Sequence, residues 1–556
     1  MNRNVESHFA LNPTNIDIRR STFDRSHSLK TSFNVGDIVP FFLDEVLPGD
    51  TFNVDTSKVV RLQTLLTPVM DNIYLDTYFF FVPNRLTWSH WKQFNGENTE
   101  SAWIPQTEYE IPQITAPAES GWSVGTIADY LGVPTGVPSL SVSALPFRAY
   151  ALVMNEWFRD ENLSDPLVVP VDDATVAGVN TGTFVTDVAK GGLPYKAAKY
   201  HDYFTSCLPS PQKGPDVLIP SATSGNFPVV ALGDVHEAGG FALSGVTGST
   251  DRNVLLSSSG YLKASSGSVN VGLVDNNAIS FDPTNLWALS SGGLGASINQ
   301  LRMAFQIQKL YEKDARGGSR YIEILKSHFG VTSPDARLQR PEYLGGNRVP
   351  ININQVVQQS ATASGETAQG TVTGMSVTTD THSDFTKSFT EHGFVIGVMV
   401  ARYDHTYQQG LERFWSRKDR FDYYWPVFAN IGEQAVKNKE IFAQGPAQKD
   451  SAGNVIDDQV FGYQEAWADY RYKPSRVTGE MRSQYAQSLD VWHLADDYTA
   501  LPMLSDSWIR EDKTNVDRVL AVTSAVSNQL FADIYIKNRT TRPMPMYSIP
   551  GLIDHH

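Results

Sequence analysis

A run of apolar residues near the start of the chain most strongly limits the folds that this sequence can adopt. Between Ile73 and Val82 nearly every residue is β-branched or aromatic, and Pro83 follows. A strand with one face in water alternates apolar with polar side chains, and this segment does not. We therefore expect a strand that is covered on both faces. One cover is the core of its own domain, and the other could be a helix, a long loop or a second copy of the protein.

The composition indicates a globular protein without disulfides. Hydrophobic residues make up 41% of the 556 residues and charged residues 19%, which is outside the range of disordered chains. The single cysteine, Cys207, allows no intramolecular disulfide, and the first residues lack the apolar stretch of a signal peptide. These features predict a soluble protein that is made in the cytosol.

The charge balance restricts any contact with nucleic acid. The formal net charge is -15 at pH 7, whereas a surface that binds DNA throughout is basic. Contact with a polyanion must then be confined to local patches, and the sequence offers two, one in the polar arm of residues 1–30 and one after a predicted strand at 530–536. For the arm, a solvated segment on the domain surface is an equal alternative. The predicted nucleic-acid-binding residues are Arg3, Arg19, Arg20, Lys537, Arg539 and Arg542.

The order of the predicted elements favours a mainly β fold. Strand-like segments are numerous and separated by very long connections, and the clearest helix is at 146–158. No alternation of strand and helix with short loops occurs, which argues against a parallel α/β fold. We predict an antiparallel sandwich of jelly-roll type, with long loop insertions and a few helices.

One region differs in composition from the rest of the chain. Residues 223–297 hold only seven charged side chains and are dominated by Gly, Ser, Thr, Val and Asn. This pattern predicts an inserted, strand-rich surface segment. We therefore expect residues 1–222 and 297–556 to form the jelly-roll domain and residues 223–296 to form a protruding insertion.

No pattern of residues predicts catalysis. The segment Gly293–Ile298 begins like a dinucleotide-binding fingerprint but lacks its third glycine. His405 follows a predicted strand, and Glu156, Asp160 and Glu161 cluster on a predicted helix, but a structural ion pair explains either group better than catalysis does. We expect no enzymatic activity, no cofactor and no metal. The alternative to a structural protein is a jelly-roll glycan-binding protein or carbohydrate-active enzyme.

Several segments resemble one family from end to end of the chain. The sequence is similar to the major capsid proteins of gokushoviruses, which belong to the Microviridae, small icosahedral bacteriophages with single-stranded DNA. Residues 223–297 depart from this resemblance, as expected of a variable insertion. The matching segments are Phe23–His27, Asp44–Phe52, Met70–Trp88, Asn155–Asn162, His201–Ser206, Pro341–Gly346 and Ile549–His556.

The resemblance implies an eight-stranded antiparallel jelly roll of the viral capsid type and a structural role in a virion. It implies self-assembly through pentamers into a T=1-type shell around circular single-stranded DNA, within the cytoplasm of a bacterial host. It also implies an internal scaffolding protein, a minor pilot-type protein and a small basic DNA-binding protein as partners. The insertion at 223–296 would then contact a receptor on the host surface.

Assembly would also explain a second cover over the apolar strand. Long aromatic loops are costly to order on an isolated domain, so neighbouring copies could order them. We therefore predict that Phe80, Val82, Arg85 and Trp88 pack between subunits.

Overall fold

The computed structural model describes most of the chain. It covers residues 19–101, 107–215, 217, 298–318, 320–360, 362, 364 and 367–547, with six short strands between 229 and 288. The chain divides into two compact units, residues 1–213 with 312–556, and residues 214–311. Arg3 lies outside the described residues, as does most of the predicted insertion.

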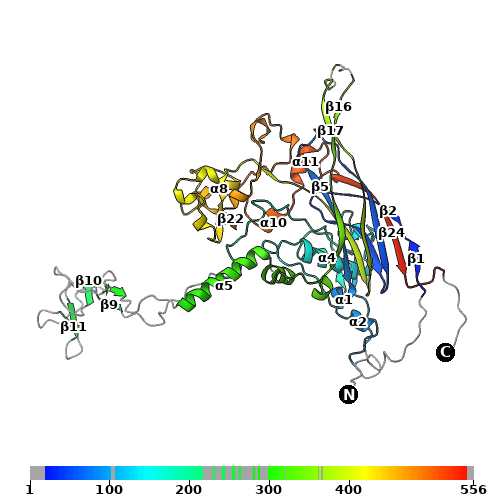
Figure 1. The fold of residues 1–556 in the computed structure, drawn as a ribbon, viewed down its shortest axis with the longest axis horizontal. Coiled ribbons are helices and arrows are strands. Elements are labelled where there is room, and N and C mark those ends of the chain that lie inside the picture. Colours follow the sequence, from blue (N-terminus) through cyan, green and yellow to red (C-terminus); the bar gives the residue numbers. More distant parts are fainter. Residues whose placement is uncertain are drawn as a thin grey trace. The chain divides into compact units, whose positions relative to one another are not determined.

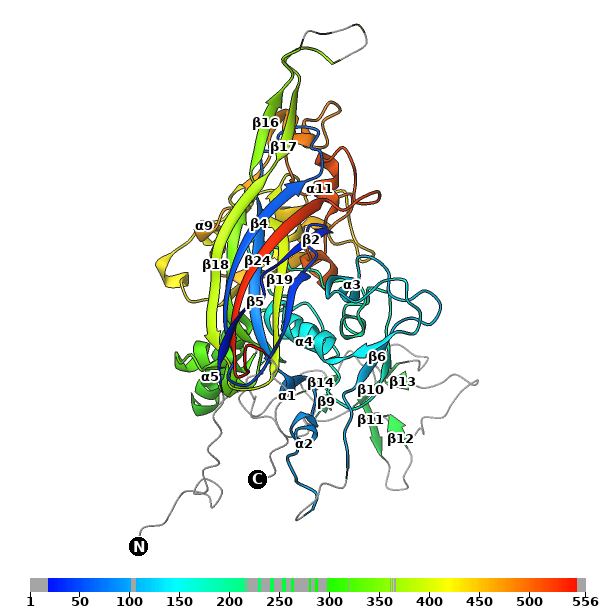
Figure 2. The same ribbon diagram turned by 90° about the vertical axis from the view of Figure 1, so that its right-hand side faces the viewer.

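The first sheet of the larger unit is antiparallel and has an interrupted strand at one edge. Its order is β1 (Ser21–Asp24), β24 (Leu530–Arg542), β4 (Thr51–Leu62) and β18 (Thr378–Ser388). β2 (His27–Phe33) pairs with the same side of β24 as β1 does, so β1 and β2 together occupy one strand position. Figure 2 shows β18, β4 and β24 as long strands lying side by side.

The second sheet is also antiparallel. Its order is β15 (Glu342–Pro350), β5 (Ile73–Pro83), β19 (Gly393–Tyr403) and β3 (Val39–Val46). β5 is therefore a central strand, paired with β15 on one side and with β19 on the other.

The path of the chain through these sheets is that of a jelly roll. Strands β2 and β4 belong to the first sheet and β3 and β5 to the second; β15 and β19 then belong to the second sheet, and β18 and β24 to the first. Eight strand positions divided between two antiparallel sheets in this order form two Greek keys. The prediction of a mainly β antiparallel fold is confirmed.

A hydrophobic core fills the space between the two sheets. One face of β5 contributes Leu75, Phe79 and Phe81, and the first sheet contributes the inward side chains of β4 and β24. These side chains alternate with outward ones along β4 and β24 because successive residues of a strand point to opposite sides.

The other face of β5 is covered by the same chain. Phe80 and Val82 belong to a second buried cluster, together with residues of β19 and of helix α4 (Leu145–Val153). α4 lies within the long connection from β5 to β15 and packs on β5 and β19 (Figure 2). The expectation that both faces of this strand are covered is confirmed.

The long connection from β5 to β15 supplies this cover with some of its elements, α4 among them. It holds α1 (Asn84–Thr87), α2 (Trp91–Phe94), β6 (Gln113–Thr115), α3 (Ile127–Tyr130), β7 (Ser141–Ser143), α4, the π-helical turn η2 (Met154–Phe158), β8 (Val176–Ala177), η3 (Val188–Lys190), α5 (Ile298–Gly317), α6 (Tyr321–Ile324), η5 (Leu325–Phe329) and α7 (Asp335–Leu338). The predicted helix at 146–158 thus comprises an α-helix that continues as a π-helical turn.

The smaller unit contains the six short strands between 229 and 288. β12 (Leu262–Ala264), β11 (Asn253–Leu256), β10 (Phe241–Ser244) and β13 (Ser280–Phe281) form one sheet in that order. β14 (Leu286–Ala288) pairs with β9 (Val229–Ala231). The predicted insertion at 223–296 falls within this unit.

Two further regions complete the larger unit. A hairpin of β16 (Ile353–Val357) and β17 (Val372–Ser376) extends beyond the two sheets (Figures 1 and 2). The connection from β19 to β24 packs around a third buried cluster, which includes Phe204, Tyr407 and Phe461. This connection holds β20 (Thr406–Tyr407), η6 (Arg413–Ser416), η7 (Arg420–Asp422), η8 (Pro426–Phe428), β21 (Glu433–Lys437), α8 (Asn438–Ile441), η9 (Ile456–Asp458), β22 (Val460–Glu465), α9 (Ala468–Arg471), β23 (Ser475–Arg476), η10 (Gly479–Met481), η11 (Asp490–Trp492), α10 (Asp506–Ile509) and α11 (Thr514–Val519).

Within the described ranges, none of the helices combines the length and the apolar character needed to cross a bilayer.

Candidate nucleic-acid interface

The outward surface of the first sheet is polar and exposed, and we call it the open face. Along β24 the buried residues alternate with outward ones. The outward residues of β24 are Phe531, Asp533, Tyr535, Lys537, Arg539 and Thr541. The neighbouring strands β4 and β18 present mainly Ser, Thr and Asn on the same side, in register with β24. Unlike the outer face of the second sheet, which α4 covers, this surface is exposed along β24.

Cross-strand hydrogen bonds fix the side chains of the open face. The hydroxyls of Thr22 and Thr541 lie 2.8 Å apart, and Asn53 Nδ2 donates to Thr386 Oγ1 at 2.8 Å. Such pairs stabilise neighbouring strands of a sheet. The open face is therefore an ordered, water-facing surface that carries many hydrogen-bonding groups.

Two of the predicted basic residues project from the middle of this surface. Lys537 Nζ lies 3.4 Å from a carboxylate oxygen of Asp55, and Arg539 stands opposite Asp24 in the β1–β24 pair. Hydrogen bonds from Ser26, together with the charges of Arg539 and Lys537, lower the pKa of Asp24. Both cations remain in contact with solvent, so they are available to an anion.

The two basic clusters, far apart in the sequence, meet at one end of the sheet. Ser21 pairs with Arg542, so Arg19 and Arg20, both exposed, lie next to the end of β24. Arg20 donates a hydrogen bond to the carbonyl oxygen of Gly49, in the turn between β3 and β4.

Arg542 has a different environment from the other basic residues. Its Nε lies 3.2 Å from Asp50 Oδ2, and its NH2 group donates to the carbonyl oxygen of Glu45 at 2.6 Å. Only 16% of its side chain is exposed. Arg542 thus holds the β3–β4 turn against β24, and its charge is paired within the chain.

Sequence reasoning missed four residues of the open face. Lys30 and Arg61 are exposed cations on β2 and β4, and the rings of Phe531 and Tyr535 are 39% and 49% exposed. Buried and outward residues alternate along β24 as far as Arg542, but the alternation of apolar and polar residues in the sequence ends at Ile536. An interpretation that ended this strand at Ile536 separated the basic residues from the sheet.

The residues predicted to pack between subunits have partners in their own chain. Phe80, Val82 and Trp88 are each no more than 1% exposed, and Trp88 Nε1 donates to Asp173 Oδ1 at 2.6 Å. Arg85 forms a two-point ion pair with Glu391, at 2.7 and 3.2 Å. For Phe80, Val82 and Trp88, contact with a neighbouring subunit would require the residues of the same chain that bury them to move away. The packing of these four residues between subunits stays a prediction.

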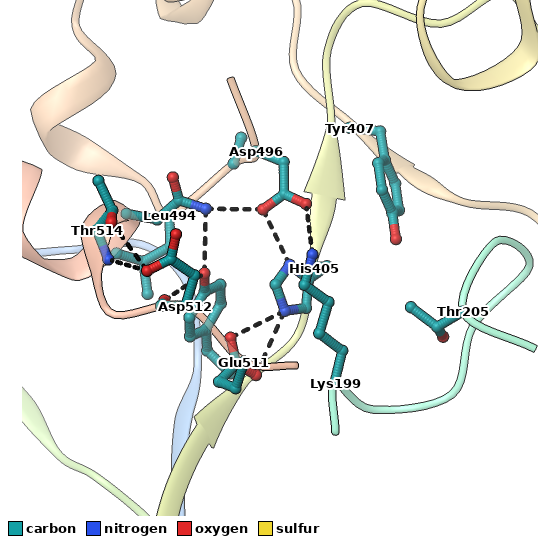
Figure 3. A network of polar contacts seen from close by, with 12 residues as sticks. Lys199, Thr205, His405, Tyr407, Leu494, Asp496, Glu511, Asp512 and Thr514 are labelled. Carbon is teal, nitrogen blue, oxygen red and sulfur yellow. Dashed lines mark hydrogen bonds and ion pairs between the residues drawn. The ribbon is translucent and has the colours of Figure 1, made fainter. Parts of the chain in front are cut away.

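A buried network surrounds His405, one of the groups considered for catalysis (Figure 3). His405 Nδ1 lies 2.9 Å from Asp496 Oδ1, and Nε2 lies 3.1 Å from Glu511 Oε1. Lys199 Nζ lies 3.6 Å from the other oxygen of Asp496. Burial alone would lower the pKa of His405, but the charges of Glu511 and Asp496 raise it to about 10. The protonated ring therefore donates to both carboxylates.

This network is structural. The side chain of His405 is only 1% exposed, and that of Glu511 is fully buried, so a substrate cannot reach the ring. The network joins the chain after β19 to the segments that lead to β24. The prediction of a structural ion pair at His405 is confirmed.

The acidic residues after helix α4 also have structural partners. Asp160 Oδ1 accepts backbone N–H bonds from Asn162 and Leu163 at 2.9 Å each, and Glu161 lies 2.7 Å from Arg320. Burial raises the pKa of the Cys207 thiol well above its ordinary value. Among the described residues, no group of three or more His, Cys, Asp or Glu side chains is placed to hold a metal ion.

Comparison with known proteins decides the family. Residues 13–552 match the family model described as "Capsid protein (F protein)". The chain belongs to this capsid protein family. A relative from Chlamydia phage 1, named "Capsid protein VP1", is 43% identical to this chain. The alignment covers 99% of this chain and 98% of the relative. The protein of the same name from Spiroplasma virus 4 is 43% identical over 96% of this chain and 96% of its own length. That from Bdellovibrio phage phiMH2K is 42% identical over 99% of this chain and 98% of its own length.

The resemblance to gokushovirus major capsid proteins is thereby confirmed. The capsid protein is a structural component of a virion, and its family implies self-assembly into a capsid that encloses the genome. The alternative of a glycan-binding protein or carbohydrate-active enzyme has no support from these relatives. The relatives are structural proteins.

Proposed function

We propose that the capsid protein builds a small T=1-type icosahedral shell around circular single-stranded DNA, and that its open face contacts this DNA. The proposal of a shell subunit is supported by the family match, which spans residues 13–552. The DNA contact is supported by the chemistry of the open face.

The open face carries more cations than carboxylates. Three carboxylates, Asp24, Asp55 and Asp533, lie on this side of the sheet. The cations on the same side and at its end are Arg19, Arg20, Lys30, Arg61, Lys537 and Arg539. Each cation that replaces a counterion at a phosphate favours binding. The excess is local, because the whole chain has a net charge of -15.

Aromatic rings add a second means of holding a single strand. Tyr535 is two residues before Lys537 on the same face of β24, and Phe531 stands opposite Arg61. Bases of single-stranded DNA stack on exposed rings without sequence preference. A surface that carries both rings and cations therefore suits a circular genome of any sequence.

Substitution of the two central cations tests this contact. The double variant Lys537→Ala with Arg539→Ala should lower the affinity of the purified protein for a single-stranded oligonucleotide. The slope of log affinity against log salt should fall by about 0.7 for each phosphate that the protein no longer neutralises. Lys449→Ala is the matched control, because Lys449 is exposed and lies in the connection from β19 to β24, outside the open face. An unchanged salt slope in the double variant would contradict the proposed DNA contact.

We further propose the partners that the resemblance implies. The acidic charge of the chain supports a small basic DNA-binding protein, since the DNA phosphates need more cations than the open face provides. Assembly would proceed through pentamers on an internal scaffolding protein, with a minor pilot-type protein as a further component. Omission of each protein from a co-expression system tests its role through the yield of closed shells.

The insertion at 223–296 is proposed as the site of host attachment. Its low charge and its Gly, Ser and Thr content suit an exposed segment that tolerates sequence change. Deletion of 223–296 should leave assembly intact and abolish adsorption to host cells. Particles that still adsorb normally would refute this role.

A further inference from the structure

An exposed aromatic segment lies in the connection from β19 to β24. Every residue from 418 to 427 is exposed. The exposed fractions are 60% for Phe421, 51% for Tyr423, 45% for Tyr424, 50% for Trp425 and 81% for Val427. Single apolar residues on a surface are ordinary, but a contiguous group of this size marks an interaction site. Aromatic residues together with arginine are also enriched at protein interfaces.

The segment is held in shape by its own hydrogen bonds. The carboxylate of Asp422 accepts the backbone N–H groups of Lys418 and Asp419 at 2.8 and 2.9 Å. The indole of Trp425 donates to the carbonyl oxygen of Arg420 at 2.9 Å. The rings are therefore presented to solvent in a fixed arrangement, and a partner would lose little free energy in ordering them.

A cavity opens next to this segment. Its volume is about 400 Å³, and its walls include Phe414, Trp415 and Tyr470. Arg417 connects the cavity with the segment, because its guanidinium pairs with Asp469 and lies 4.3 Å from the ring centre of Tyr470. The aromatic surface is thus continuous with a concave site that could receive a protruding side chain.

The charges around the cavity favour an acidic partner. Five Lys and Arg side chains line it, among them Arg476 and Arg482, against three carboxylates. The chain as a whole has a net charge of -15. A second copy of the chain therefore complements the cavity electrostatically.

We propose that the aromatic segment and the cavity form a contact surface for a second copy of this chain. The proposal rests on the capsid role and adds the residues that join subunits. A fully buried aromatic side chain covers about 150–250 Å², so the half-exposed rings supply on the order of 400 Å². A standard interface buries about 800 Å² on each partner, so the segment would provide roughly half of one.

The test compares assembly with folding in the full-length protein. Phe421→Ala with Val427→Ser removes apolar surface and keeps the Trp425 hydrogen bond. The double variant should keep the unfolding midpoint of the wild type and lower the yield of closed shells about ten-fold or more, as loss of an interface hot spot does. Trp425→Ala should act in the same direction, and Trp425→Phe should retain most of the assembly.

A matched control uses a ring of similar exposure outside both the aromatic segment and the open face. Tyr321 on α6, which is 66% exposed, should be replaceable by Ala without loss of shells. If the double variant gave a normal yield of shells, the proposal would be overturned. This holds even if those shells lacked DNA or another virion protein. A wild-type protein that forms no closed assemblies would instead refute the capsid role itself, so the two failures are distinguishable.

Discussion

The two long strands β5 and β24 have opposite surroundings within one jelly roll. Both faces of β5 are buried, one between the sheets and one beneath helix α4 and its neighbouring loops. β24 buries one face and presents the other to solvent. The sequences differ accordingly, because β5 is a nearly continuous apolar run and β24 alternates. The pattern of a strand in this fold therefore indicates whether the chain covers its outer face.

The difference also separates two roles for the sheets. The second sheet carries the long connection from β5 to β15, which supplies a second core. The first sheet keeps a polar outer face with an excess of cations. Stability should thus be most sensitive on the covered face of β5, and DNA contact most sensitive on the open face.

The largest effect is expected from Phe80→Ala. Phe80 packs against Trp157 and Phe158, with ring centres 5.4 and 6.0 Å away. Truncation of a buried Phe costs about 3–5 kcal/mol because it leaves a cavity. Urea unfolding should show this loss, with soluble protein and particle yield reduced together. Tyr535→Ala, the control on β24, should stay within about 0.5 kcal/mol of the wild type.

A smaller loss is expected from His405→Gln. The variant leaves the buried carboxylate of Glu511 without a cation, which costs about 3 kcal/mol. The raised pKa also gives a pH dependence. The contribution of His405 is complete below its unfolded pKa of about 6.5, and it is lost as the pH rises through about 10. Unfolding curves from pH 6 to 10.5 should show an alkaline decline in the wild type that is weaker in the variant. An identical decline in both proteins would remove His405 as its source.

Asp76→Asn should have an intermediate effect on the second sheet. Asp76 lies on β5 and forms ion pairs with Arg348 at 2.7 Å and with Arg402 at 2.6 Å. Burial opposes ionisation, but hydrogen bonds and charges from both arginines lower the pKa of Asp76. Loss of charge at this position should cost about 2 kcal/mol, since the amide keeps part of the hydrogen bonding.

The same variant has a testable dependence on acid. The contribution of Asp76 is present above its unfolded pKa of about 3.9 and is lost as the pH falls through the lower folded value. The stability difference between wild type and Asp76→Asn should therefore shrink in acid. A difference that stays constant down to pH 2 would show that the ion pairs do not contribute.

The smallest effect on stability is expected from Lys537→Ala with Arg539→Ala. Both residues are on the exposed side of β24, and exposed ion pairs contribute about 0–1 kcal/mol. The unfolding midpoint should hardly change, while the DNA content of purified particles falls. If stability and DNA content fell together, the open face would be part of the structural core, and its contrast with β5 would disappear.

The sequence allowed correct prediction of the mainly β fold and of the double cover of β5, since both follow from the hydrophobic pattern. It did not allow prediction of the full length of β24. Asn538 and Thr540 point inward where an apolar residue was expected, and Asn538 Nδ2 donates to the buried carboxylate of Asp44 at 3.1 Å. Polar residues inside a sheet break the apolar alternation that identifies a strand.

The source of the second cover was likewise beyond sequence reasoning. The apolar run showed that β5 is covered on both faces but not that helix α4, over sixty residues later, supplies the cover. The meeting of Arg19 and Arg20 with the end of β24 depends on a strand pairing between the two ends of the chain. Such long-range register follows from the whole fold rather than from either segment.

A cryo-electron microscopy map of assembled particles that contain DNA tests the central claim most directly. We predict closed icosahedral shells in which the open face lines the inner surface, with DNA density next to Tyr535, Lys537 and Arg539. The same map should show α4 of each subunit covering its own β5. An open face on the outer surface of the particle, with no DNA density near β24, would contradict the account.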